Sequence, residues 1–495
     1  MIAIPLLRAL EEEKEKQAKE PTLLPEIHKV IIDLNLEFPG GRQEARLWVH
    51  QATDKIIEGT GVNKDPQRQG INEERSKLTS QYLFAKLEGD VIRTLVNWDS
   101  EENSLRENKD GASSPRAIYH IWPDFEIRAL TTKSISTVKA DAARASFAAM
   151  GEEIVWAVMD SGIDVNHRHF IFHHNTDLVL PLEHLDFTSQ DRPKEDPNGH
   201  GTHVAGIIAG EMSPSTAPDS ASDGAFAVVR GRNEQGVVSY NKIKITAISG
   251  MAPKCKLVSL RVLDEKGRGD VSSLIAAIAK IQEINGHGRR LLIHGVNISV
   301  GNDFDPEWFA CGQSPLCSEV DHLVKSGVVV VVAAGNSGYG LLQSKFTGVV
   351  AAGMALTIND PGNSAEAITV GSTHRDMPHV YGVSYFSSKG PTGDGRSKPD
   401  LVAPGEKIIS CAAGVTRAKA TEKQGDCDYV EDSGTSMAAP HVSGVIAAFL
   451  SIRREFIGQP DKVKEIFLST ATDLKRERYF QGYGLVDLMR AIQSV

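Results

Sequence analysis

The sequence predicts an α/β protein with a parallel sheet covered by helices on both faces, preceded by a small α+β unit. Residues 154–492 alternate short apolar, β-branched runs with longer segments of helical spacing. These runs are continuous rather than alternating, which is typical of strands buried on both faces. Residues 28–122 show a shorter alternation of strand and helix patterns, and 495 residues suffice for two units.

The small α+β unit is expected over residues 1–130. Its strands are expected at 28–38, 82–87 and 117–122, its helix at 45–56, and a helix or a strand at 90–98. Residues 1–20 combine a short apolar patch with a charged run and predict a charged helix or tail. They lack the basic start, long apolar stretch and small-residue cleavage site of a signal peptide. As numbered, the chain is expected to be cytoplasmic, or secreted if a signal was removed.

The larger unit is expected over residues 131–495. Its strands are expected at 154–159, 256–263, 291–300, 328–334, 367–371 and 407–412, and its helices at 202–209, 270–284 with Asp270 as N-cap, 319–325, 436–453, 461–470 and 486–492. Polar residues at the carboxyl ends of such strands are where active sites lie. The Ser-, Asp- and Gly-rich segment 211–248 is expected to be a polar surface insertion, and segment 339–358 is a second extra stretch.

Composition restricts the partners and metals to be expected. The net charge of -10 argues against a nucleic-acid partner, and no run of about 18 apolar residues predicts a membrane span. The five cysteines are sparse and odd in number, which favours free thiols, although Cys311 and Cys317 are close enough in sequence to pair. No Cys/His pattern indicates zinc.

The stretch around Ser436 is the first candidate for chemistry. It stands between small residues at the start of an apolar helix. A helix N-terminus offers free N–H groups and a partial positive charge, which suit a nucleophilic serine and an oxyanion beside it. Pro440 is tolerated only because it lies near the first turn. Alone, such a string could equally be an ordinary helix start.

Three more polar residues stand at the ends of predicted elements. Asp160 ends the strand at 154–159, His200 precedes the helix at 202–209, and Asn336 follows the strand at 328–334. The order Asp, His, Ser along the chain is one of the known orders of a catalytic triad.

These four motifs together resemble those of the subtilisin-like serine proteases, the subtilases, closely from about residue 131 and more loosely before it. The resemblance implies an endopeptidase that acts on proteins or peptides through an acyl-enzyme, with no cofactor in the chemistry. Ser436 would be the nucleophile, His200 the base, Asp160 its orienting group, and Asn336 the oxyanion donor together with the backbone N–H of Ser436.

Alternatives remain beside this interpretation. His203 stands in the same motif as His200 and is expected to pack or cap, while a metal-binding pair of the two lacks a third ligand nearby. Asp164 has the chemistry of Asp160 but lies beyond a glycine turn and is expected to be structural. The rival functions are a catalytically silent binding protein on this fold, and an esterase or peptide ligase using the same triad.

The resemblance also points to a substrate cleft. The segment containing Ser299, Val300 and Gly301 resembles the strand that lines it, and Ala333, Ala334 and Gly335 would form another wall. Asn359 would lie at the floor of the primary pocket, with Pro361 a candidate cis proline. Subtilases often have glycine where this chain has Asn359, so a smaller and more polar floor is expected.

Subtilases commonly carry a prosegment that assists folding and inhibits the enzyme. Residues 1–130 are therefore expected to be a prosegment and intramolecular inhibitor, cleaved between Leu130 and Thr131; a plain inter-domain linker stays open as the alternative. Two acidic stretches form either solvated loops or a negative rim that attracts basic side chains or calcium. One precedes Ser436 and contains Glu422, Asp426, Asp428, Glu431 and Asp432, and the other follows the cleft strand and contains Asp303, Asp305 and Glu307. Structural calcium is common in the family, but no complete ligand loop is evident here.

Overall fold

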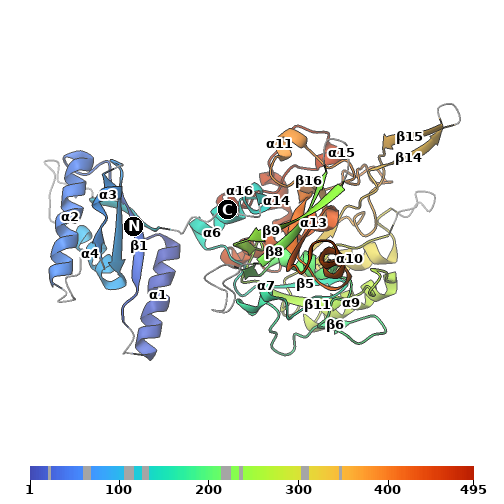
Figure 1. Ribbon diagram of the computed structural model, residues 1–495, viewed down its shortest axis with the longest axis horizontal. Coiled ribbons are helices and arrows are strands. Elements are labelled where there is room, and N and C mark those ends of the chain that lie inside the picture. Colours follow the sequence, from blue (N-terminus) through green and yellow to red (C-terminus); the bar gives the residue numbers. More distant parts are fainter. Residues whose placement is uncertain are drawn as a thin grey trace. The chain divides into compact units, whose positions relative to one another are not determined.

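The computed structural model describes ten stretches of the chain. They are residues 1–20, 24–59, 69–77, 79–104, 116–124, 133–212, 225–232, 238–302, 311–344 and 348–495. The chain divides into two compact units, Met1–Ile127 with Ala145–Ala148, and Arg128–Arg144 with Ala149–Val495 (Figure 1). The expected cleavage point at Leu130 and Thr131 lies outside the described residues.

The first unit contains a four-stranded antiparallel sheet in the order β2-β3-β1-β4. The strands are β1 (Ile27–Leu34), β2 (Gly70–Ile71), β3 (Tyr82–Glu88) and β4 (Ile118–Pro123). Helices α2 (Gly41–Gly59) and α4 (Gly89–Ser104) pack against each other and share one apolar core with the sheet. The ambiguous pattern at 90–98 is therefore a helix.

Residues 1–20 are part of this core, so the expectation of a charged tail is wrong and the helical alternative holds. Helix α1 (Ile4–Lys19) buries Leu6 and Leu10 in the core of the unit. Its charged run is compatible with this packing because Glu13, the buried acidic residue of the run, has hydrogen-bond partners. Glu13 accepts a hydrogen bond from the backbone N–H of Glu26 at 2.8 Å and lies 2.9 Å from Nε2 of His28.

The second unit is built on a seven-stranded parallel sheet in the order β17-β16-β13-β12-β5-β11-β6. The strands are β5 (Val155–Asp160), β6 (Leu185–Asp186), β11 (Lys256–Arg261), β12 (Gly295–Ile298), β13 (Val329–Ala333), β16 (Ile368–His374) and β17 (Leu401–Glu406). This confirms the predicted α/β fold class.

Helices cover both faces of this sheet. On one face, α9 (Val271–Ile284) and α10 (Pro315–Lys325) pack against alternate residues of β5, namely Val155, Ala157 and Met159. Because successive side chains of a strand point to opposite faces, Asp160 faces the other layer. That layer contains α8 (His200–Ile208) and α13 (Thr435–Ile452). The alternation along β5 thus directs one carboxylate toward the two helices that carry the candidate histidine and serine.

Helix α13 is long and apolar enough to cross a membrane by length and composition, with 18 residues and a mean hydropathy of 1.4. This differs from the expectation that no stretch reaches that length. However, 83% of it is buried inside the unit, where it packs along β12, β13, β16 and β17. It is therefore the central core helix of the domain.

Two strand predictions need correction. Segment 407–412 does form a strand, β18 (Ile408–Cys411), but this belongs to a separate four-stranded sheet in the order β18-β19-β8-β9. Strand β17 takes the edge of the parallel sheet instead. It escaped prediction because Pro404 and Gly405 interrupt its apolar pattern, and proline is tolerated on an edge strand, where an N–H can lack a partner.

Both extra segments contain hairpins. In the expected insertion 211–248, β8 (Ala225–Arg232) and β9 (Val238–Ile245) pair and join β19 (Tyr429–Asp432) in the second sheet. In segment 339–358, β14 (Tyr339–Ser344) and β15 (Gly348–Gly353) form a two-stranded sheet.

The remaining elements are α3 (Glu73–Ser76), α5 (Lys133–Thr137), α6 (Ala140–Phe147), α7 (Arg168–Ile171), β7 (Glu211–Met212), β10 (Ile248–Ser249), α11 (Pro378–Tyr381), α12 (Gly414–Gln424), a 3-10 turn (Arg454–Phe456), α14 (Pro460–Thr470), α15 (Arg478–Gln481) and α16 (Leu488–Gln493).

Candidate active site

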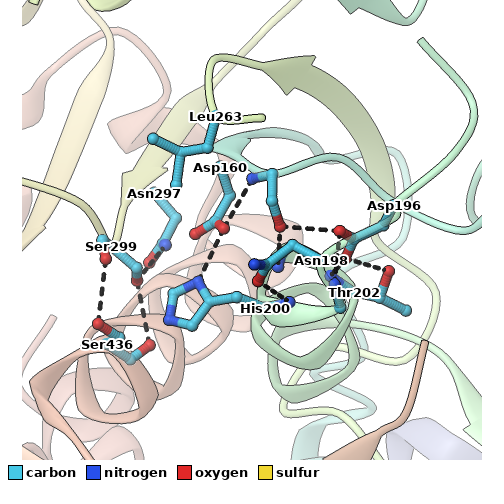
Figure 2. Close-up of polar contacts among 12 residues, drawn as sticks. Asp160, Asp196, Asn198, His200, Thr202, Leu263, Asn297, Ser299 and Ser436 are labelled. Atoms are coloured by element: carbon cyan, nitrogen blue, oxygen red, sulfur yellow. Dashed lines mark hydrogen bonds and ion pairs between the residues drawn. The ribbon is translucent and has the colours of Figure 1, made fainter. Parts of the chain in front are cut away.

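Asp160 and His200 are joined directly. Asp160 is the last residue of β5 and is fully buried, and its Oδ1 lies 2.7 Å from Nδ1 of His200. His200 is the first residue of α8, two residues earlier than the helix was expected to start. Figure 2 shows the opposite edge of the imidazole turned toward Ser436. The ring thus stands between a buried carboxylate and a hydroxyl.

A second buried carboxylate, Asp196, holds the start of α8 in place. It accepts hydrogen bonds from the Ser161 hydroxyl and the Gly199 backbone N–H at 2.8 Å each, and from the Thr202 N–H and hydroxyl at 2.7 Å each. The end of β5 and the turn before α8 are therefore tied to one group (Figure 2). Sequence reasoning missed Asp196, although an acidic residue just before a helix N-terminus was a usable signal.

Ser436 lies in the first turn of α13, close to its predicted start. Its hydroxyl donates a hydrogen bond to the carbonyl of Ser299 at 3.0 Å, and the hydroxyl of Ser299 donates to the carbonyl of Ser436 at 3.1 Å (Figure 2). The Ser436 hydroxyl is thus hydrogen-bonded to the end of the strand segment. It lies beside the imidazole of His200 but is not hydrogen-bonded to it. Rotation about its Cα–Cβ bond is what would bring the two together.

Asn336 and the backbone of Ser436 border one small space. The side-chain oxygen of Asn336 accepts from the N–H of Thr435 at 2.9 Å and from its hydroxyl at 3.1 Å. This fixes the amide so that its NH₂ points the other way. A Cβ added to Gly434 would lie 3.4 Å from that nitrogen and 3.7 Å from the N of Ser436. Glycine at 434 therefore leaves room beside two N–H donors.

These residues open into a cleft of about 620 Å³. Its lining includes the predicted residues His200, Ser299, Val300, Gly301, Ala333, Gly335, Asn336, Asn359 and Ser436, and also Asn198, Leu263, Gly267, Arg268, Gly269, Ser337 and Thr435. The second set was not predicted, since loop residues from distant segments carry no local pattern. Ala334 is not in the lining: it is buried, with its N–H bonded to Val370 and its carbonyl to Asn359.

Two backbone segments that continue from the cleft lining, after Gly301 and after Asn359, are joined to each other. The N–H and carbonyl groups of Asn302 and Asp360 exchange hydrogen bonds of 3.0 Å. Gly335 has a φ of +106°, and a Cβ there would come within 2.5 Å of Oδ1 of Asn359. Asn359 thus fills space next to Gly335 in the cleft lining, and its place at the floor of the primary pocket stays a prediction. The bond preceding Pro361 is cis, as suggested from the sequence.

The sequence that forms this site has relatives among known proteins. The family model described as "Subtilase family" matches residues 151–485, a stretch that contains Asp160, His200, Asn336 and Ser436. The chain belongs to the subtilase family. This subtilase is 33% identical over 326 residues to pyrolysin of Pyrococcus furiosus, a match that covers 60% of this chain and 21% of pyrolysin.

Two relatives from Bacillus subtilis are covered over more of their length. The subtilase is 28% identical to serine protease AprX over 422 residues, 83% of this chain and 80% of AprX. It is 29% identical to subtilisin E over 359 residues, 72% of this chain and 70% of subtilisin E. The chain therefore spans most of these two relatives but only about a fifth of pyrolysin, as the 21% coverage states.

The two histidines of the motif differ in electrostatic environment. Burial by itself disfavours the charged form of His200, but the negative charge of Asp160 and its hydrogen bond outweigh this and raise the pKa of His200 above 6.5. Burial lowers the pKa of His203, whose Nε2 is 3.1 Å from the carbonyl of Val430. His203 thus packs in the core as expected. Asp164 is engaged in the turn, accepting from the N–H of Asn166 at 3.1 Å.

Three of the five acidic residues between 422 and 432 are paired with arginines. Asp426 pairs with Arg417 at 3.0 Å, Asp428 with Arg168 at 3.6 Å, and Glu431 with Arg375 at 3.6 Å. Asp303, Asp305 and Glu307 lie outside the described residues. Arg268, by contrast, lines the cleft directly.

Among the described residues, no group of three or more His, Cys, Asp or Glu side chains could hold a metal ion. All five cysteines are buried as free thiols, Cys311 and Cys317 included.

Proposed function

We propose that this subtilase is a serine endopeptidase that hydrolyses peptide bonds through an acyl-enzyme. The observation that carries the proposal is the 2.7 Å contact of Asp160 with His200, at a cleft that Ser436 also lines. In a chain of the subtilase family, this arrangement supports the roles of orienting group, base and nucleophile, respectively. The proposed steps use no cofactor.

In the first step the Ser436 hydroxyl leaves the Ser299 carbonyl and turns toward the free edge of the imidazole. His200 removes its proton as Oγ bonds to the substrate carbonyl carbon. The proton then passes to the leaving amine as the C–N bond breaks. A water molecule, deprotonated by the same imidazole, hydrolyses the ester and restores the serine. Asp160 keeps the proton-bearing Nδ1 toward itself throughout.

The negative charge that develops on the carbonyl oxygen needs donors placed in advance. The NH₂ group of Asn336 and the N–H of Ser436 both border the space left by Gly434. An oxyanion there would accept from both, and this type of fixed donor is usually the largest single contribution to such catalysis. We assign the segment Ser299–Gly301 to the substrate backbone and Asn359 to the primary pocket.

A labelled fluorophosphonate tests the assignment. We expect one adduct on Ser436 of the wild-type chain, and neither label nor peptide cleavage with Ser436→Ala. A folded wild-type chain that resists the label would favour the silent binding protein. An esterase or ligase would be indicated by ester turnover or peptide joining with little peptide hydrolysis, so the same preparation is assayed on matched peptide and ester substrates.

We further propose that residues 1–130 are a prosegment cleaved by the chain itself. The first unit has its own core, which is compatible with an independently folding inhibitor. Intact mass over time should give a wild-type fragment that begins near Thr131, at a rate independent of concentration because the bond is held in the same molecule. Ser436→Ala should keep all 495 residues. A wild-type chain that stays full length yet cleaves peptides would make this unit a permanent domain.

A further inference from the structure

The β14–β15 hairpin, Tyr339–Ser344 and Gly348–Gly353, is a two-stranded sheet with no further strand beside it in the described structure. It projects from the body of its unit (Figure 1). Leu341 is 74% exposed, Val349 65% and Tyr339 46%. No charged residue occurs in either strand. Exposed apolar strands with open edges are normally blunted by charge, because they otherwise pair with another chain.

The base of the hairpin is firmly anchored. The Gly338 N–H donates to the Phe386 carbonyl at 2.9 Å, and the Met354 N–H donates to the Gly338 carbonyl at 3.0 Å. A Cβ at Gly338 would lie 1.9 Å from the carbonyl oxygen of Ser387, so the backbone is in direct contact there. The ring of Tyr339 also packs edge-on against Tyr385. The hairpin therefore projects from a base that is held by hydrogen bonds and packing.

The chain segments on both sides of the hairpin contribute residues to the cleft lining. On one side, Asn336 and Ser337 line the cleft just before β14, and on the other, Asn359 lines it after β15. A substrate polypeptide held at Ser436 extends beyond the cleft, so its outer residues pass the base of the hairpin. The cross-strand register puts Leu341, Val349 and Ala351 on the same face, because Leu341 lies opposite Ala351 and Gln343 opposite Val349.

We propose that the hairpin is an accessory substrate-binding site that adds an extended, apolar stretch of the substrate polypeptide as a third strand. The inference rests on the proposed peptidase function and deepens it. Main-chain hydrogen bonds to an open strand edge supply affinity, and the uncharged face selects apolar, β-branched segments. The favoured substrate is an unfolded protein with an apolar stretch beside the cleaved bond.

The test uses three substrates with the same cleaved tetrapeptide, each assayed on the full chain. One is unextended, one carries alternating Val and Thr residues at both ends, and one carries Gly and Ser there. We expect the wild type to prefer the Val/Thr substrate over the Gly/Ser substrate by about tenfold or more in kcat/KM, mainly through KM. The double variant Leu341→Glu with Val349→Glu should lose this preference and retain kcat/KM on the unextended substrate.

The matched control is Val179→Glu with Leu180→Glu, a pair of side chains that are each 81% exposed and are not among the cleft-lining residues. It should keep the preference. Equal turnover of both extended substrates by the wild type would overturn the inference. A second outcome would also overturn it: the wild type is a dimer in light scattering, and the hairpin variant is a monomer that keeps the Val/Thr preference. In that case the hairpin binds a second copy of the chain and not the substrate. Absence of any turnover of the unextended substrate would refute the proposed function, and the accessory site with it.

Discussion

Ser299 and Ser436 exchange two hydrogen bonds, each hydroxyl donating to the other residue's backbone carbonyl. In an uninterrupted helix, the Ser436 carbonyl would accept from the N–H four residues later. That residue is Pro440, which has no N–H. The proline inside α13 therefore leaves the carbonyl of the candidate nucleophile free to bind the strand that lines the cleft. Pro440, which the sequence suggested was merely tolerated in the helix, thus helps to position Ser436 against Ser299.

A double-mutant cycle at Ser299 and Pro440 tests this link. Ser299→Ala should lower the free energy of unfolding by about 2 kcal/mol, because its hydroxyl both donates to the Ser436 carbonyl and accepts from Nδ2 of Asn297, and both hydrogen bonds are lost. Pro440→Ala supplies a competing N–H, so the Ser299→Ala change should cost less in that background. Urea unfolding is measured in the Ser436→Ala chain, which keeps the carbonyl and cannot digest itself. Effects that add within about 0.3 kcal/mol would contradict the link.

The raised pKa of His200 predicts an alkaline activity profile. The proposed base acts only when neutral, so the acidic limb of kcat/KM against pH should lie above 6.5. Asp160→Asn should shift that limb to lower pH and reduce kcat by roughly 10⁴. An acidic limb at or below 6.5 in the wild type would show that Asp160 does not stabilise the imidazolium.

The same shift links pH to stability. Because the folded-state pKa is raised, the stabilisation from the Asp160–His200 pair is fully present below the unfolded pKa of about 6.5 and is lost as pH rises through the folded value. Activity should therefore rise over the pH range in which this part of the stability falls. Thermal unfolding of Ser436→Ala with and without Asp160→Asn measures the contribution.

Asn336 should act on turnover rather than binding. Asn336→Ala is expected to lower kcat by about 10² to 10³ with little change in KM, the range seen on removing the corresponding donor in subtilisin. Asn336→Asp is the informative partner, because it keeps the oxygen that Thr435 binds and removes the NH₂ donor. It should retain the melting temperature and still lose turnover. A defect confined to KM would contradict the assignment.

Arg268 predicts a charge preference opposite to that of an acidic rim. It is exposed and lines the cleft, whereas three of the five acidic residues between 422 and 432 are paired with arginines. Peptides with an acidic side chain facing Arg268 should be favoured by up to about fivefold at low salt, the strength of an exposed ion pair. Arg268→Glu should reverse the preference, and Lys266→Glu, in the same loop but outside the lining, should not. A cleavage profile unaffected by Arg268→Glu would dispose of the idea.

Much of this protein could be predicted from local pattern. Continuous apolar runs such as Val329–Ala333 indicate buried parallel strands because every side chain on them must be covered. Asp160, His200 and Ser436 stand in short motifs at a strand end or a helix start, next to glycines. The residue types in these motifs were enough to indicate the chemistry. The sequence by itself thus determined the fold class and the candidate triad.

Tertiary structure alone decided which distant groups meet. Asp196 acts on the His200 turn, and Arg268 joins the cleft lining. Asp428 and Glu431 pair with Arg168 and Arg375, which come from distant segments. None of these has a local signature, because hydrogen bonds and ion pairs depend on spatial neighbours rather than on spacing along the chain. The same holds for the strand at 407–412, whose β pattern was correct while its sheet was not: a strand's propensity comes from its own residues, but its partner is set by which edges the rest of the fold leaves open.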